Sequence, residues 1–320
     1  MRNGETPMRD LTDSLNSILR SAEPSEEEKE GAQRSHRYLR DILLIGNMES
    51  IIQDHFLSGS YPRATAIRPL DDVDVIFVVD PGHWKLPNSG ALPAPSAVLQ
   101  TFDRALERRY QATMRRVQRR SIRLQMQHLN VDVVPAVSVD GRGSERLLIP
   151  DAESDTWIRS APKLHAALAT EINQRNGELF KPLVKLLKTW NLGAPEELRF
   201  KSFCVETIAT RLFESARLNS LQTGLAQFFD FVCYLGGGPC EFRWGDDRGM
   251  SLRLGECVVP DTAEGMNVAA SVTRKGLECC LRRAATSRDR IFQAERARTW
   301  NDAESKIEQA FGSHLRALGW

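Results

Sequence analysis

Residues 59–74 read GSYPRATAIRPLDDVD, and this stretch decides the fold because it joins a Gly-Ser pair to two closely spaced aspartates. Asp72 and Asp74 lead directly into the apolar run 75–79, whose β-branched residues predict a buried strand. Side chains alternate along a strand, so both carboxylates point to the same face of the sheet. Two carboxylates so close repel each other unless a cation lies between them, and hard oxygen ligands suit Mg²⁺.

A third acid extends the same pattern. Asp132 lies inside the apolar run VDVVPA of residues 131–136, which predicts a second buried strand with one acid in it. If the two strands are neighbours, the three carboxylates converge. Such a group suits two Mg²⁺ ions, about 3.5–4 Å apart, that activate a hydroxyl and stabilise a leaving phosphate. Gly59 and Ser60 complete the site, because glycine lets the backbone approach a phosphate and serine donates hydrogen bonds to it.

These motifs, taken in order, resemble the polymerase-β-type nucleotidyltransferase superfamily: a Gly-Ser pair, Asp-x-Asp on a strand, and a later strand with one aspartate. The longer string of residues 59–75 resembles, more narrowly, the bacterial cGAS/DncV-like nucleotidyltransferases (CD-NTases), which make cyclic oligonucleotide signals. Segment 181–206, with KLLKTWN and then KSF, is similar to the nucleotide-binding segment of their helical lobe. The resemblance covers most of the chain, and the ordered set is far more specific than Asp-x-Asp alone.

The resemblance implies an α+β fold in two parts. Residues 1–160 would form a polymerase-β-like palm with a mixed sheet and the N-terminal helices, and residues 161–320 a mainly helical nucleotide-binding lobe, with the active site in the cleft between them. Asp72, Asp74 and Asp132 would then hold two Mg²⁺ ions, for which Mn²⁺ can substitute, and would be the catalytic residues.

The implied reaction joins nucleoside triphosphates, with ATP and GTP as expected substrates. A ribose hydroxyl attacks the α-phosphate and pyrophosphate leaves. Repeated transfer closes a ring of two or three nucleotides, and in this family the product is a second messenger that activates a separate effector during phage infection (CBASS). The residues that the resemblance places around the nucleotide are Gly59, Ser60, Lys185, Lys188, Ser202 and Phe203.

The residues of the helical lobe leave their own roles open. Lys185 and Lys188 share one face of an amphipathic helix, where solvated lysines are the commoner meaning. Their place in the motif beside Ser202 favours a contact to the triphosphate, above all for Lys188, which would then face ligand rather than core. Phe203 is most simply a core aromatic, although by resemblance it could stack on a nucleobase.

Composition fits an ordinary globular protein. The chain has 320 residues, of which 41% are hydrophobic and 27% charged, and its net charge of +1 creates no field that demands nucleic acid. No apolar run reaches the roughly 18 residues of a membrane span, and the N-terminus has no signal core, so we expect a cytoplasmic protein without a membrane partner. The six cysteines lack metal-ligand spacing, which predicts reduced thiols and no zinc-binding insertion.

Eight arginines fall within residues 104–123, where the pattern predicts a helix over 96–118 and a strand over 121–127. Such a patch can bind nucleic acid or an acidic protein, or simply be solvated. Tyr110 is the only aromatic among them, so we favour a solvated or partner-binding face, and some arginines could offset the negative charge of the site. We therefore expect no obligate nucleic acid, a possible regulatory protein partner, and an effector met only through the product. The arginines are Arg104, Arg108, Arg109, Arg115, Arg116, Arg119, Arg120 and Arg123.

Three other hypotheses stay open. An RNA-extending enzyme, such as a CCA-adding or oligoadenylate-forming transferase, would need a tract for its RNA acceptor, and the arginine cluster is the only candidate. A silent nucleotide-binding regulator should lack one of the three aspartates, yet all are present. A toxin or an antibiotic-modifying nucleotidyltransferase is usually smaller and lacks the Lys-Ser pair of the helical lobe.

Outside the motifs, the sequence predicts mainly helices in its second half. Loops are expected at 80–97 and 140–160, where proline, glycine and serine gather, and strand-like segments at 241–244 and 252–254. The predicted helices cover 163–175, 178–192, 202–218, 220–235 and 265–298, with a short helix after 299.

Overall fold

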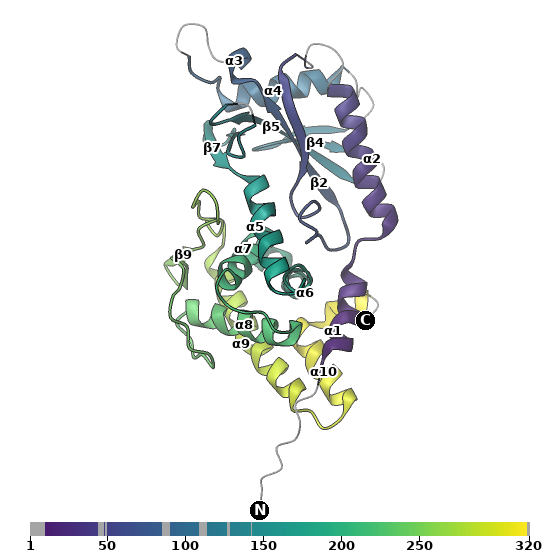
Figure 1. The fold of residues 1–320 in the computed structure, drawn as a ribbon, viewed down its shortest axis with the longest axis vertical. Helices are drawn as coiled ribbons and strands as arrows, with labels where there is room; N and C mark the ends of the chain where they lie inside the picture. The colour runs from purple at the N-terminus through teal and green to yellow at the C-terminus, as the bar shows by residue number, and fades with distance from the viewer. Residues whose placement is uncertain are drawn as a thin grey trace, which may run out of the picture. The chain divides into compact units, whose positions relative to one another are not determined.

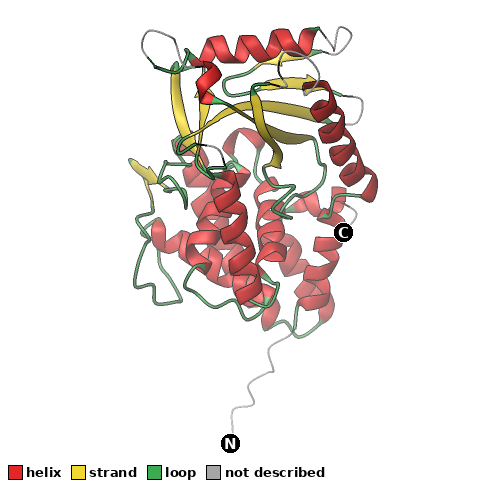
Figure 2. Ribbon diagram, turned by 45° about the horizontal axis from the view of Figure 1, so that its top comes forward, coloured by secondary structure: helices red, strands yellow, loops and turns green. Residues whose placement is uncertain are grey.

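The computed structural model describes residues 10–43, 48, 50–84, 90–108, 114–126, 129–141 and 143–318. The chain divides into two compact units (Figure 1). The sheet unit is Pro24–Ala167, and the helical unit combines Met1–Glu23 with Leu168–Trp320. Figure 2 shows the strands gathered almost entirely in the sheet unit, and the exception is one short hairpin. Within the described residues, none of the helices combines the length and apolarity that a membrane span requires.

The sheet unit is built on a mixed sheet, which among the described residues has the strand order β1–β2–β5–β4–β3, with β6 paired to β5 and β7 paired to β6. β2 and β5 are parallel, and the other pairs are antiparallel. The two strands predicted around the aspartates are confirmed as β2 and β5. The strands are β1 (Ile52–Ser58), β2 (Asp72–Val79), β3 (Arg115–Val117), β4 (Ile122–Gln125), β5 (Asn130–Ser138), β6 (Leu147–Asp151) and β7 (Thr156–Ser160).

The two faces of this sheet carry different side chains. On one face, alternate residues of β2 from Val73 to Val79 pack in a hydrophobic core with α2 (Glu26–Leu43) and α4 (Pro95–Glu107), and Figure 1 shows both helices beside the sheet. A short helix, α3 (Pro81–Trp84), follows β2. Because side chains alternate along a strand, the residues between those core positions face the other way, beginning with Asp72 and Asp74.

The start of α2 is tied to the loop that leads into β2. Ser25 and Glu28 form a capping box, in which the Ser25 hydroxyl accepts from the Glu28 N–H (3.2 Å) and the Glu28 carboxylate accepts from the Ser25 N–H (2.6 Å). The other carboxylate oxygen of Glu28 accepts from the Leu70 N–H at 2.9 Å. One acid therefore caps the helix and positions the chain two residues before Asp72.

The helical unit buries a large aromatic core. Trp190 of α6 lies with its ring centroid 5.0 Å from that of Phe229 on α8, and both side chains are almost fully buried. α5 (Pro162–Arg175) begins at the end of the sheet unit and continues into this one. The other elements are α1 (Thr12–Ala22), α6 (Phe180–Leu192), η1 (Glu196–Leu198), α7 (Ser202–Phe213), α8 (Leu221–Leu235), β8 (Ser251–Arg253), β9 (Glu256–Val258), α9 (Arg274–Glu295), α10 (Trp300–Phe311) and η2 (Ser313–Leu318).

The first helix corrects the expected division of the chain. We expected residues 1–160, including both N-terminal helices, to form one part, but α1 belongs to the helical unit while α2 belongs to the sheet unit. The apolar stripe of α1 explains this, because Leu15 and Ile18 are fully buried in the core that α6 and α8 provide. The Leu11 N–H also donates to Gln222 of α8 at 3.0 Å.

Several predicted elements differ from the structure in length or type. The helix expected over 96–118 ends at Glu107, and its arginine-rich end is the edge strand β3. The segment 140–160, expected as a loop, contains β6 and β7, whereas 241–244 forms no strand. The helix expected from 265 begins at Arg274, after the Thr273 side chain accepts from the Gly276 N–H. The strand differences have one cause, because strand pairing depends on distant segments that local composition does not encode, whereas the start at Arg274 follows from the local Thr273 cap.

Candidate active site

The three predicted carboxylates come together on β2 and β5. In the parallel register, Asp74 lies opposite Asp132, and Asp72 lies opposite Asn130. Directly opposite residues place their side chains on the same face. The structure therefore brings Asp72, Asp74 and Asp132 to one face of the sheet, while their role in metal binding stays a prediction.

A single row of cross-strand partners runs through this site. Asp132 on β5 is opposite Arg123 on β4, which is opposite Arg116 on β3, and on the other side Asp74 is opposite Ser58 on β1. Two arginines on outer strands thus adjoin two aspartates on inner strands. The arginine-rich segment belongs to this row because it forms strands instead of the end of a helix.

Arg123 binds two of the three carboxylates. Its Nη2 and Nε atoms donate to the two oxygens of Asp132 at 2.6 and 3.0 Å, and Nη2 also donates to Asp72 Oδ2 at 3.2 Å. The Asp132 side chain is only 10% exposed, whereas that of Asp72 is 60% exposed. The expectation that an arginine offsets the charge of the site is confirmed for Arg123.

Negative charge nevertheless remains in excess at Asp74. Burial, and then the charges of Asp132 and Asp72, raise the pKa of Asp74 to about 6, although Arg63 and Arg123 act in the opposite direction. An acid whose pKa lies that far above its ordinary value is held in an environment that favours the neutral form. A bound cation would relieve this repulsion.

Gly59 is the residue that lets the preceding turn approach Asp74. A Cβ atom added to Gly59 would lie 2.7 Å from Asp74 Oδ2, and the backbone has φ +80°, which side chains rarely allow. Ser60 follows in the same turn, where its carbonyl accepts from the Thr65 N–H at 3.0 Å. The Gly-Ser pair is therefore beside the carboxylates, and its contact with a phosphate stays a prediction.

The donor chemistry of the site fits a hard divalent cation. Asp72 and Asp74 offer carboxylate oxygens with excess charge, which is the ligand type of Mg²⁺ and Mn²⁺. Within the described part of the chain, however, no three His, Cys, Asp or Glu side chains are already arranged as a metal site. Both oxygens of Asp132 accept hydrogen bonds from Arg123.

The two predicted lysines both have acidic partners within the helical unit. Lys188 is 3% exposed, and its Nζ lies 2.7 Å from Glu206 Oε2 on α7. Lys185 pairs with Glu23, which follows α1. Lys188 is therefore buried, whereas the sequence predicted that it faces ligand rather than core, and its contact with the triphosphate stays a prediction. Its position between α6 and α7 makes it first of all a buried ion pair.

Ser202 and Phe203 open α7 in the same unit. Ser202 is the first residue of the helix and is exposed, and Phe203 is half-buried. The N–H groups at the start of a helix and the positive end of its dipole favour anions. The predicted roles of Ser202 on phosphate and of Phe203 on a base stay predictions.

Arg115, Arg119 and Arg120 of the arginine cluster, like Arg123, pair with nearby acids. Arg115 lies 3.4 Å from Asp103 and 3.0 Å from a Glu107 oxygen. The acid that Arg119 and Arg120 share is Asp151, at 2.7 and 2.9 Å. The cluster therefore presents much less free positive charge than its sequence indicates. Arg109 and Tyr110 lie outside the described residues.

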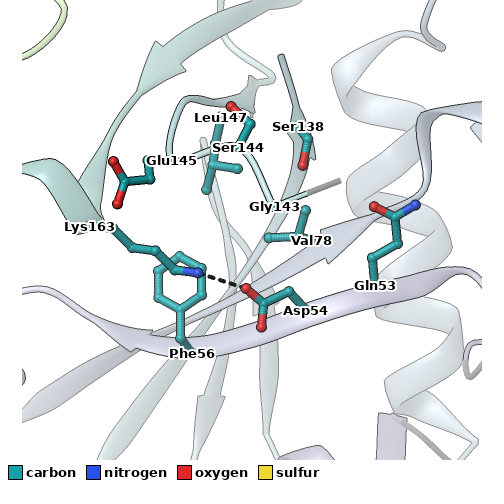
Figure 3. Close-up of a pocket in the computed structure, with 10 residues that line it drawn as sticks. All are labelled: Gln53, Asp54, Phe56, Val78, Ser138, Gly143, Ser144, Glu145, Leu147 and Lys163. Carbon is teal, nitrogen blue, oxygen red and sulfur yellow. Dashed lines mark hydrogen bonds and ion pairs between the residues drawn. The ribbon is translucent and has the colours of Figure 1, made fainter. Parts of the chain in front are cut away.

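A separate cavity of about 220 Å³ lies further along the carboxylate-bearing face of the sheet (Figure 3). Lys163 and Asp54 point toward each other at its rim, with 2.8 Å between Nζ and Oδ2. A row formed by Phe56, Ile76 and Val134 lies between the cavity and the carboxylates. We therefore do not count the cavity as part of the candidate active site.

Sequence reasoning missed Glu28, and it named Arg123 only as one of eight arginines, some of which could offset the charge of the site. Glu28 was readable from the Ser-x-x-Glu spacing at 25–28, which is the pattern of a capping box. Arg123 was readable from its place between Ile122 and Leu124, since alternation sends it to the face opposite that apolar pair. Its pairing with Asp132 could not be read, because that depends on which strands are neighbours.

Comparison with known proteins gives consistent matches. The family model for the Second Messenger Oligonucleotide or Dinucleotide Synthetase domain (SMODS) matches residues 10–173. The cyclic AMP-AMP-AMP synthase of an Acinetobacter species is 34% identical over 196 residues, which are 61% of this chain and 56% of that protein. The cyclic UMP-AMP synthase of Rhodothermus marinus is 25% identical over 190 residues, covering 52% of this chain and 66% of that protein. The matched segments thus span a little over half to two-thirds of these relatives.

Solved structures match over nearly the whole chain. E. coli MS115-1 CdnC, in its complex with HORMA-deltaN, superposes with a TM-score of 0.72 at 18% identity, covering 94% of this chain and 96% of that one. The Bradyrhizobium diazoefficiens CD-NTase CdnG, in complex with GTP, gives a TM-score of 0.70 at 14% identity and covers 98% and 100%. At these identities the likeness shows the fold, and it confirms the expected mixed sheet with a mainly helical second part.

Proposed function

The chain belongs to the family of Second Messenger Oligonucleotide or Dinucleotide Synthetase domains, and from that membership we propose that it is a nucleotidyltransferase that joins nucleoside triphosphates into a cyclic oligonucleotide. The observation that carries the proposal is the meeting of Asp74 and Asp132 side by side, with Asp72 on the same face. The excess negative charge there, and the glycine that Asp74 requires beside it, support the same proposal.

Asp72 and Asp74 are the residues that would hold Mg²⁺ or Mn²⁺, with Asp132 joining them. When bound, the metal supplies charge that neutralises the triphosphate and lowers the pKa of the acceptor hydroxyl. Gly59 keeps the space beside Asp74 free of a side chain, so that the turn can lie against the substrate. Ser60, the next residue of that turn, donates its hydroxyl or N–H to a phosphate oxygen.

The reaction is an in-line displacement. The ribose oxygen of the acceptor forms a bond to the α-phosphorus of the donor, while the bond from that phosphorus to the bridging oxygen breaks and pyrophosphate leaves. In the helical unit, Ser202 contributes the start of α7 to the phosphates. Lys188 acts through Glu206, since their pair ties α6 to α7 and fixes the end that carries Ser202.

Repeated transfer closes a ring of two or three nucleotides. ATP is the first substrate to test, because both named relatives make products that contain AMP. The cyclic product would serve as a second messenger for a separate effector in anti-phage defence. A regulatory protein partner fits this role, because the solved complex of CdnC contains HORMA-deltaN.

The test is incubation of the purified protein with the four labelled nucleoside triphosphates and Mg²⁺ or Mn²⁺, followed by phosphatase and mass spectrometry. A product that survives phosphatase and has the mass of a cyclic di- or trinucleotide is the expected result. Products that are all linear would favour an oligonucleotide-extending enzyme. No nucleotide turnover, with or without a protein partner, would favour a silent nucleotide-binding regulator.

A further inference from the structure

Arg123 lies where the candidate metal ligands meet, and its guanidinium bridges two strands. It binds both oxygens of Asp132 on β5 and one oxygen of Asp72 on β2. The neighbouring residues of β4, Ile122 and Leu124, are fully buried in the core on the opposite face. The Arg123 side chain is therefore directed to the carboxylates and takes no part in that core.

This contact places a positive charge among the carboxylates. Asp132 is buried, and a buried carboxylate without a partner is strongly unfavourable. Arg123 satisfies it with a two-pronged contact, the geometry in which a guanidinium binds a carboxylate best. The same guanidinium reaches Asp72, so one positive charge is shared by two of the three acids.

The contact also conflicts with a divalent cation at the same oxygens. A metal ion held by Asp72 and Asp132 would lie close to the guanidinium that these acids now bind, and like charges repel. The Arg123 side chain is 34% exposed, so it can turn toward solvent. The charges that act on Arg123 are those of Asp132, Asp72 and Asp74, and all three raise its pKa.

We propose that Arg123 is a built-in placeholder for the metal: it neutralises Asp132 and Asp72 in the metal-free protein and withdraws from at least one of them when the metal enters. The proposal rests on the proposed function for the identity of the incoming cation. It assigns Arg123 two opposed effects, since the residue stabilises the metal-free fold and weakens metal binding. A residue that is only structural would not weaken metal binding, and a residue that helps to hold metal and nucleotide would strengthen it.

The experiment compares Arg123→Met with Arg37→Met. Methionine keeps an unbranched apolar side chain and removes the charge, and Arg37 is an exposed arginine of α2, the helix on the opposite face of the sheet. For each protein, the melting temperature is measured without metal, and Mn²⁺ alone is titrated by calorimetry without nucleotide. For Arg123→Met we expect a melting temperature lower by several degrees and a Kd for Mn²⁺ tighter by about tenfold. Arg37→Met should leave both values unchanged.

Arg123→Lys keeps the test decisive if the methionine variant does not fold. Lysine retains the charge but loses the two-pronged contact, so we expect Mn²⁺ to bind about two- to fivefold more tightly than to the unsubstituted protein. Mn²⁺ affinity that is unchanged or weaker in the folded Arg123 variants would overturn the placeholder. If the unsubstituted protein itself binds no Mn²⁺ at millimolar concentration, the cation site, the proposed function and the placeholder proposal are all wrong. Failure of the placeholder alone is therefore distinguishable from failure of the proposed function.

Discussion

In the sheet unit, one buried aspartate and a group of three aspartates have opposite electrostatic surroundings. Asp151, at the end of β6, is 1% exposed and accepts hydrogen bonds from Arg119 and Arg120, and also from the backbone N–H groups of residues 153 and 154. Burial alone would raise the pKa of Asp151, but the hydrogen bonds from the two arginines outweigh it and hold that pKa well below its usual range. This acid is fully compensated by the fold.

The group of Asp72, Asp74 and Asp132 is left with too little positive charge. Arg123 serves two of its members, and the pKa of Asp74 is still raised to about 6 by burial and by the other two carboxylates. The same chain segment supplies Arg119 and Arg120 to one acid and only Arg123 to the group of three. Acids whose pKa is raised by burial and by neighbouring carboxylates are found at functional sites. This difference supports the proposal that the three carboxylates bind a cation.

The largest expected effect is on catalysis. Replacing Asp72 and Asp74 together by asparagine should lower pyrophosphate release on the order of 10³-fold or more, because the cation ligands are removed while the side-chain shape is kept. Asp151→Asn is the matched control and should stay within a few-fold of the unsubstituted protein, assayed below its melting temperature. If the double variant released pyrophosphate nearly as fast as the unsubstituted protein, the proposed difference between the group of three acids and Asp151 would be wrong.

The buried pair of Lys188 and Glu206, in the helical unit, gives a second test of an acid that is neutralised by its own fold. Lys188→Met removes the ammonium beside a buried carboxylate, so the free energy of unfolding should fall by about 3–5 kcal/mol. Adding Glu206→Gln should restore part of the loss, because the buried charge is then gone as well. The measurement is denaturant unfolding of both variants. A Lys188→Met protein of unchanged stability with a much higher KM for nucleotide would instead place this lysine on the triphosphate.

The next expectation concerns how stability depends on pH. The folded pKa of Asp74 is raised, so its carboxylate penalises the fold progressively as pH rises from about 4 through 6. Asp74→Asn should therefore exceed the metal-free protein in stability above pH 6, by on the order of 2–3 kcal/mol, and match it below about pH 4.

The folded pKa of Asp151 is depressed, so its contribution to stability is fully present above about pH 4 and is lost as pH falls. Asp151→Asn should be less stable at neutral pH, by about 2 kcal/mol.

The measurement is the melting temperature of the three proteins between pH 3 and 8 without metal. The two variants should fall on opposite sides of the unsubstituted protein at neutral pH. Asp74→Asn should converge on it by about pH 4, whereas Asp151→Asn should approach it only partly at pH 3, because the folded pKa of Asp151 lies well below its usual range. If the melting temperatures of Asp74→Asn and Asp151→Asn at pH 7 lay on the same side of the unsubstituted protein's, the contrast between the two acids would be contradicted.

The smallest effect is expected from adding DNA or RNA to the synthesis reaction. Because Arg115, Arg119 and Arg120 are bound to acids of the same unit, purified protein freed of nucleic acid should make product from nucleoside triphosphates and metal alone, or with a protein partner. The assay compares product with and without DNA or RNA at low and moderate salt. Strong stimulation that disappears when these arginines and Arg116 are neutralised would show instead that the cluster binds an activating nucleic acid.

Local sequence was sufficient for the centre of the site. Asp72 and Asp74 precede an apolar run, and Asp132 interrupts another, so two strands with three acids followed from alternation alone. The parallel pairing of these strands confirms the convergence predicted from the motif order. Gly59 was also readable as a close-approach residue, and the side chain that lies against it is that of Asp74.

What sequence reasoning missed depends on contacts between distant segments. The arginine-rich stretch was extended as a helix because arginine is compatible with both structures, and only pairing with β4 makes residues 115–117 a strand. The pairing of Lys188 with Glu206 could not be read, because Glu206 lies on another helix. The place of α1 was wrong for the same reason, since an apolar stripe shows that a helix is buried but not against which partner.

The central claim is that the uncompensated carboxylates form a cation site, and the shift in melting temperature on adding millimolar Mn²⁺ tests it most directly. The unsubstituted protein and Asp151→Asn should each gain several degrees, because the ion binds only the folded state. The protein with Asp72→Asn and Asp74→Asn should gain nothing. An equal gain in that double variant would show that Mn²⁺ binds elsewhere and would contradict the account.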